Sequence, residues 1–202
     1  MMHKYLPLSV ILIFCLFCSS RDGWHTDVPD LKGKLLKGDS INLRTIAKDK
    51  VTVLNIWSIF CHPCMNELPV IHKLYDKYKD RKDFAFISLA MDSEEELLKF
   101  LDPKDSTDPY RKMFLESGVD SFYMPTLACL PHGYLFTRER WYPLELDSLE
   151  RSRMRSMFNT EGIPTTLVYS RTGKLVFNQF GSFNDTDIVV LEKKLDKMLQ
   201  PK

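Results

Sequence analysis

The sequence predicts an α/β domain in which buried strands alternate with amphipathic helices. Residues Val51–Trp57 form an apolar run, as expected of a central strand that is covered on both faces. Met65–Tyr78 then repeats apolar residues at the spacing of one helical face, and Phe84–Ala90 is a second apolar run. Because a helical segment separates the two runs, we expect these strands to pair in parallel.

Two cysteines lie where the first strand meets the helix, in the sequence Cys61-His62-Pro63-Cys64. Unpaired N–H groups and the positive end of the helix dipole favour a thiolate at Cys61. The two-residue spacer allows Cys64, one turn inside the helix, to attack a mixed disulfide formed on Cys61. The motif therefore predicts a redox-active pair. Half of a zinc site is the alternative, but Pro63 and the buried strand before the motif favour redox chemistry.

The remaining elements follow in order along the chain. Ser93 is a good N-cap for a helix after the second strand, and Tyr110–Ser117 is expected to form a short helix. Thr165–Tyr169 is rich in β-branched residues, and a turn connects it to Leu175–Phe180 as an antiparallel hairpin. Apolar spacing then predicts a closing helix that includes Ile188, Leu191, Leu195, Met198 and Leu199.

The motif around the cysteines extends to C-x-P-C-x-x-E-x-P over Cys61–Pro69. With Gly162–Thr166 and the turn Arg171–Lys174, it resembles the thioredoxin-fold proteins of the TlpA/ResA type. The resemblance runs from about Leu31 to Leu199, and departs at Phe60, where the family usually has Trp. It implies a thioredoxin fold with a central mixed β-sheet flanked by helices, an N-terminal hairpin and an inserted segment before the cis-proline strand.

The resemblance also implies that Glu67 is an active-site glutamate. Residues three apart share a helix face, so Glu67 is expected near Cys64. A partly buried carboxyl there would have a raised pKa and could take the proton from Cys64 as it attacks. A solvated glutamate in the first helical turn is the alternative. Asn55 occupies the position of a buried aspartate in thioredoxin, and cannot titrate.

A substrate platform is implied at Ile163 and Pro164. The bond between them is expected to be cis, with the Ile163 backbone facing the disulfide and pairing with a substrate polypeptide. Trp57, four residues before the pair, and His62, between the two cysteines, are also expected to contact substrate. A His62 imidazolium would favour the Cys61 thiolate.

Tyr123–Cys129 contains a second Met-Pro-Thr sequence, but it matches the family's strand before the cis-proline segment. Cys129 within it is interpreted as a small buried apolar residue, with a resolving or zinc-ligand role as the alternative. Residues 131–161 are longer than the family core requires. An amphipathic helix with a solvated face is the preferred interpretation there, and a partner-docking surface is the alternative.

The N-terminus predicts export. The apolar run Leu6–Phe17 is too short to span a membrane and has the length of a signal-peptide core. We expect a signal peptide at 1–17, a linker at 18–30 and a thioredoxin-like domain at 31–202. Cys18 ends a sequence that resembles a lipobox, which predicts a lipid-anchored protein of the periplasm or cell envelope. Ordinary cleavage before Arg21, giving a soluble exported form, is the alternative.

The composition and the number of cysteines limit the classes of function that the chain could have. Loss of 1–17 leaves 27 basic and 27 acidic residues, which gives no basic surplus for nucleic acid. Three cysteines remain beyond Cys15 and Cys18, so the chain has no even framework of structural disulfides. We therefore expect a catalytic disulfide that needs no cofactor and no metal.

The sequence predicts an exported thiol–disulfide oxidoreductase that reduces disulfides in exported proteins. By resemblance, apocytochrome c is an example of a substrate and a membrane protein is the electron donor. One alternative is a thioredoxin-fold peroxidase, but the usual Pro-x-x-x-Thr-x-x-Cys context is absent. The other is a Sco-like copper-binding module, which would need C-x-x-x-C and a histidine well downstream, where only His132 occurs.

Overall fold

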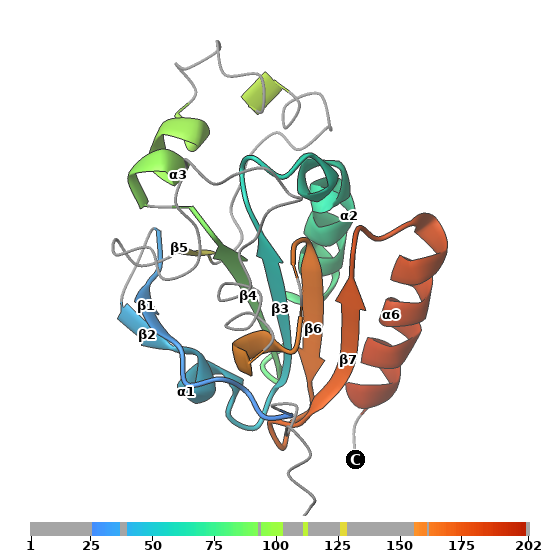
Figure 1. The fold of residues 1–202 in the computed structure, drawn as a ribbon. Helices are drawn as coiled ribbons and strands as arrows, with labels where there is room; N and C mark the ends of the chain where they lie inside the picture. Colours follow the sequence, from blue (N-terminus) through green and yellow to red (C-terminus); the bar gives the residue numbers. More distant parts are fainter. Residues whose placement is uncertain are drawn as a thin grey trace, which may run out of the picture.

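The computed structural model describes residues 26–36, 40–92, 94–102, 111–112, 126–128, 156–160 and 162–200. Its elements, in chain order, are β1 (Lys32–Lys34), β2 (Ser40–Asn42), α1 (Leu43–Ala47), β3 (Val51–Trp57), α2 (His62–Tyr78), β4 (Phe84–Ala90), α3 (Glu94–Leu101), β5 (Thr126–Ala128), β6 (Thr165–Tyr169), β7 (Leu175–Phe180) and α6 (Asp185–Met198). They form a five-stranded sheet with its helices and a separate two-stranded hairpin (Figure 1).

The central sheet is mixed, with the strand order β5-β4-β3-β6-β7. β3 pairs in parallel with β4 along its whole length, from Val51 opposite Phe84 to Trp57 opposite Ala90. On its other side β3 pairs antiparallel with β6, which forms the predicted hairpin with β7. The predicted parallel pair, mixed sheet and N-terminal hairpin of β1 with β2 are therefore confirmed.

Two apolar clusters form the core, one on each face of the sheet. On one face Trp57 packs in the same cluster as Leu68 of α2 and Leu191 of α6. On the other face Leu54 shares a cluster with Leu43 of α1. In Figure 1, α2 and α6 lie to the right of the sheet and α1 lies at the lower left. Burial on both faces explains why β3 is apolar throughout except at Thr52 and Asn55.

Capping residues set the helix ends. α2 begins at His62 with Cys61 as its N-cap, as the strand-to-helix junction predicted, and proline fits its first turn. α6 begins at Asp185, behind a capping box between Asn184 and Asp187. The five-residue α1 was not predicted from the apolar pattern, and is capped by the side chain of Asn42.

Several predictions concern residues outside the described part of the chain. These are the signal peptide at 1–17, Cys18, the N-cap Ser93, most of the short helix expected over 110–117, Cys129 and most of 131–161, of which 156–160 are described and 156–158 are helical. Among the described residues, the structure contains no helix with the length and apolar character needed to cross a membrane.

Candidate active site

The structure joins Cys61 and Cys64 in a disulfide with an S–S distance of 2.01 Å and a Cα–Cα distance of 5.2 Å. Cys61 caps α2, and its sulfur accepts a hydrogen bond from the Cys64 backbone N–H at 3.2 Å. Cys61 is 7% exposed and Cys64 is 0% exposed. Cys61 is therefore the member of the pair that retains exposed surface, and the helix terminus provides the N–H donor that stabilises a thiolate there.

Glu67 is buried on α2, one helical turn after Cys64, with 1% of its surface exposed. Asn55 Nδ2 donates to Oε1 at 3.0 Å, and the backbone N–H of Phe183 donates to Oε2 at 3.1 Å. Burial raises the pKa of this carboxyl to about 7, against the lowering effect of both hydrogen bonds. A carboxyl that titrates near neutral pH can accept and release a proton beside the disulfide, as the sequence suggested.

Asn55 has a role that sequence reasoning missed. Its amide nitrogen donates to Glu67 and also to Thr166 Oγ1 at 3.1 Å, on the strand directly opposite. Strand alternation places Asn55 on the face that carries Trp57, which is the face covered by α2. The available signal was one amide within an otherwise apolar strand, because a buried polar group needs a partner. Asn55 therefore orients the carboxyl rather than replacing it.

The bond between Ile163 and Pro164 is cis, as predicted, and β6 begins directly after it. The Ile163 side chain packs against the cluster that contains both cysteines. The Pro164 carbonyl accepts the N–H of Gly181 at 2.9 Å, which anchors the segment to the end of β7. The pairing of this segment with a substrate polypeptide stays a prediction.

Residues 25–128, just over half of the chain, match the family described as AhpC/TSA. The chain belongs to the AhpC/TSA family. The matched residues contain β1 to β5 and the Cys61–Cys64 disulfide, whereas the cis-proline segment lies beyond them.

Two curated relatives are named as a thioredoxin-like protein and as a thiol-disulfide oxidoreductase. The chain is 35% identical over 97 residues to the thioredoxin-like protein YneN of Bacillus subtilis, covering 47% of this chain and 55% of that protein. It is 30% identical over 105 residues to the thiol-disulfide oxidoreductase ResA of Bacillus cereus, covering 52% of this chain and 58% of that protein. The chain thus matches little more than half the length of these relatives.

Solved structures share the fold over a larger part of the chain. A thiol:disulfide interchange protein of the thioredoxin family from Chlorobium tepidum matches with a TM-score of 0.55 and 17% identity, over 87% of this chain and 97% of that one. A thiol-disulfide isomerase from Corynebacterium glutamicum matches with a TM-score of 0.54 and 18% identity, over 87% and 98% respectively. At these identities the likeness shows the fold alone.

The two other residues expected to contact substrate, Trp57 and His62, differ in exposure: the first is buried and the second is exposed. In this AhpC/TSA member Trp57 is 0% exposed, and its indole N–H donates to Ser88 Oγ at 2.6 Å inside the sheet. The prediction of substrate contact at Trp57 is wrong in this conformation, because the last residue of β3 points into the core. His62 is exposed in the first turn of α2, with its Nδ1 3.3 Å from Asn66 Nδ2. His62 is therefore placed where a bound partner could contact it.

A second buried carboxyl near the pair was not predicted to be functional. Asp92, which is 3% exposed, accepts hydrogen bonds from Ser58 Oγ at 2.7 Å and from the Ile59 N–H at 2.9 Å. Burial raises its pKa to about 7, the two hydrogen bonds oppose the rise, and the charge of Glu96 adds to it. Its partners lie more than thirty positions earlier in the chain, so no local pattern could reveal the contact.

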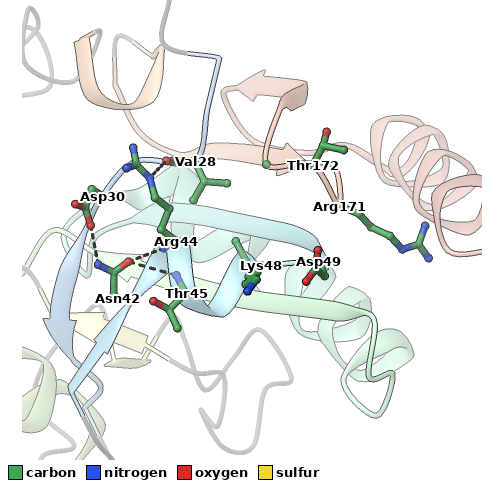
Figure 2. Close-up of a pocket in the computed structure, with 11 residues that line it drawn as sticks. Val28, Asp30, Asn42, Arg44, Thr45, Lys48, Asp49, Arg171 and Thr172 are labelled. Atoms are coloured by element: carbon green, nitrogen blue, oxygen red, sulfur yellow. Dashed lines mark hydrogen bonds between the residues drawn. The ribbon is translucent and has the colours of Figure 1, made fainter.

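The described residues contain a pocket of about 730 Å³ at the other end of β3, between α1 and the turn after β6 (Figure 2). Arg44 on its wall donates to the Val28 carbonyl at 3.1 Å. Arg171 extends away from the centre of the pocket in Figure 2, and donates to Asp83 outside it. The pocket is therefore separate from the disulfide.

No group of three or more His, Cys, Asp or Glu residues placed to hold a metal occurs in the described part of the chain.

Proposed function

We propose that this protein is a thiol–disulfide oxidoreductase that reduces disulfides in other proteins. The observation that carries the proposal is the asymmetry of the pair. Cys61 caps the N-terminus of α2 and keeps 7% of its surface exposed, whereas Cys64 is fully buried one helical turn before Glu67, a carboxyl whose pKa burial raises to about 7. This is the arrangement needed for one attacking thiol and one resolving thiol.

The cycle starts from the reduced pair. The Cys61 thiolate attacks one sulfur of a substrate disulfide, forming a mixed disulfide and releasing the other substrate sulfur as a thiolate, which takes up a proton. Glu67 accepts the proton of the Cys64 thiol, and the resulting thiolate attacks the Cys61 sulfur. The second substrate thiolate leaves and is protonated, and the Cys61–Cys64 disulfide seen here is formed. Two electrons have then passed from the pair to the substrate.

We infer that the working direction is reduction. The C-x-P-C sequence, Asn55 and Glu67 all match the reducing TlpA/ResA branch, and a curated relative bears the name ResA. The reduction potential is expected nearer to the roughly −270 mV of thioredoxin than to the roughly −120 mV of DsbA, with an upward contribution from His62. Equilibration of the purified protein with a glutathione series measures this value. Reduction by glutathione as ready as that of DsbA would indicate an oxidase or isomerase.

The proposed setting is the cell envelope. The apolar run before residue 17 and the lipobox-like Cys18 support export and lipid anchoring, where oxidised cysteines of exported proteins, such as apocytochrome c, would be substrates. A membrane electron donor would then restore the dithiol. Incorporation of labelled palmitate in wild type but not in Cys18→Ser would support the anchor, and a protein that is secreted unlabelled would exclude it.

The activity is tested by reduction of insulin with dithiothreitol as the electron source. Catalysis that is lost in Cys61→Ser supports the proposal, and a wild-type protein with no effect on the uncatalysed rate contradicts it. Two parallel assays on the same preparation test the alternatives. Rapid consumption of hydrogen peroxide without disulfide reduction would favour a peroxidase, and stoichiometric copper after purification would favour a Sco-like module.

A further inference from the structure

Asp92 lies just after β4 and faces the loop that leads from β3 into the cysteine pair. One carboxylate oxygen accepts the hydroxyl of Ser58 at 2.7 Å and the other accepts the N–H of Ile59 at 2.9 Å. All three residues are buried, with Ser58 0% and Ile59 4% exposed. A buried backbone N–H is costly to leave unpaired, so the carboxyl stabilises this conformation of the loop.

Ser58 extends the contact to the two following residues. Its hydroxyl oxygen accepts the N–H of Phe60 at 3.2 Å, and its carbonyl accepts the N–H of Cys61 at 3.1 Å. The N–H groups of three successive residues before α2 therefore bond either to Asp92 or to the serine that Asp92 holds. This chain of hydrogen bonds ends at the backbone of the attacking cysteine.

We propose that Asp92 is a positioning residue for Cys61: its carboxyl holds the Ser58–Phe60 loop so that the Cys61 sulfur lies at the N-terminus of α2. The inference rests on the proposed function, because only a thiol–disulfide oxidoreductase uses Cys61 as its attacking thiol. The reactivity of the Cys61 thiol can nevertheless be measured without any substrate. Small displacements of a reacting atom are costly, because a shift of about 1 Å can reduce a rate by about 100-fold.

The carboxyl also makes this support sensitive to pH. Its surroundings on β3 and the following loop are the Ser58 hydroxyl and the Ile59 N–H, and Glu96 of α3 is the charged group that acts on it. Burial and Glu96 both favour the protonated form, in which one oxygen loses part of its capacity to accept. Cys61 reactivity should therefore change as Asp92 titrates, separately from any effect of Glu67.

The test is the rate at which iodoacetamide alkylates Cys61 in the reduced full chain, located by peptide mass and measured from pH 5 to 9. We expect Asp92→Asn to slow alkylation about 3- to 30-fold at pH 7, because the thiolate loses its place at the helix terminus. The inflection due to Asp92 should disappear in this variant and persist in Glu67→Gln. A wild-type rate, or a faster one, in folded Asp92→Asn would overturn the proposal.

Asp83→Asn is the matched control, since Asp83 directly precedes β4 at its other end and also accepts two side-chain donors. It should lose stability without changing the alkylation profile. Should Asp92→Asn not fold, Ser58→Ala provides the second test, because it removes only the bridging hydroxyl. Slower alkylation in Ser58→Ala supports the proposal, and a wild-type rate there contradicts it.

The outcome is independent of substrate turnover. A wild type that fails to reduce insulin, with slower alkylation in Asp92→Asn, would refute the proposed function and keep the positioning role. Normal insulin reduction, with unchanged alkylation in Asp92→Asn, would refute the positioning role alone.

Discussion

The two ends of β4 carry two aspartates in opposite surroundings. Asp83, before the strand, contacts Arg81 at 3.0 Å and Arg171 at 2.6 Å, and the hydrogen bond from Arg81 is the main reason that its pKa is lowered. Asp92, after the strand, is held by a hydroxyl and a backbone N–H, and burial raises its pKa to about 7. The first carboxyl is permanently charged at neutral pH, and the second can titrate there.

Glu67 shows that the raised pKa of Asp92 is shared by a second buried carboxyl in the same part of the molecule. Like Asp92 it is buried near the disulfide, and its partners are the neutral amide of Asn55 and the N–H of Phe183. Neutral donors satisfy the lone pairs of a carboxylate but only partly offset the cost of removing its charge from water. The end of the sheet near the disulfide thus contains two buried carboxyls, Glu67 and Asp92, whose pKa is raised to about 7. The opposite end contains the ion pairs of Asp83 with Arg81 and Arg171.

The largest expected effect tests whether the disulfide end is the reactive one. Cys64→Ser should accumulate mixed disulfides with substrate, because Cys61, the partly accessible member of the pair, can attack but nothing resolves the product. Cys61→Ser should accumulate none, since Cys64 is fully buried. Non-reducing gels after incubation with oxidised protein substrate measure both. Equal trapping by the two variants would mean that burial does not assign the roles.

Glu67→Gln should slow insulin reduction by on the order of 10- to 100-fold if proton transfer limits the rate. The wild-type rate should rise as the pH is raised through about 7, because only the ionised carboxyl can accept the Cys64 proton. The amide keeps the size of the side chain and removes this dependence. A variant with wild-type rate and pH profile would show that the buried carboxyl takes no part in turnover.

The free energy of unfolding should depend on pH through the two buried carboxyls, Glu67 and Asp92. Burial raises the pKa of both carboxyls to about 7, above the ordinary values of 4.5 for glutamate and 3.8 for aspartate, so the folded protein binds more protons between these limits. The stabilisation is complete below about pH 4 and is lost as the pH rises through about 7. Between pH 5 and 8 we expect the unfolding free energy of the oxidised protein to fall by up to about 5 kcal/mol, about half of it from each carboxyl. Urea unfolding measures this change, which should be smaller in Glu67→Gln.

The sequence was sufficient for features that depend on local pattern. Apolar runs predicted β3 and β4 with their observed bounds, and the strand-to-helix junction placed Cys61 at a helix terminus. The spacing of three residues placed Glu67 close to Cys64 on α2. These inferences need only the periodicity of strands and helices.

Contacts between distant positions could not be predicted in the same way. Asn55 meets Glu67 because a strand face and a helix face pack together, and Ser58 meets Asp92 because two parallel strands end side by side. Trp57 was expected to contact substrate because it lies close to the motif, whereas its side chain packs in the core and is 0% exposed. Such outcomes depend on tertiary packing, which a single sequence does not specify position by position.

The smallest expected effect comes from the far end of β4. Asp83→Asn removes the carboxylate that links Arg81 to Arg171, and the side chain of Asp83 is 34% exposed. Water and salt screen such a pair, so we expect the unfolding free energy to fall by less than about 1 kcal/mol at low salt. The loss should shrink further in 1 M sodium chloride and should not vary between pH 6 and 8, because the carboxylate stays ionised throughout. A loss that changed with pH across this interval would mean that both ends of the strand contain titrating carboxyls, and the contrast between them would fail.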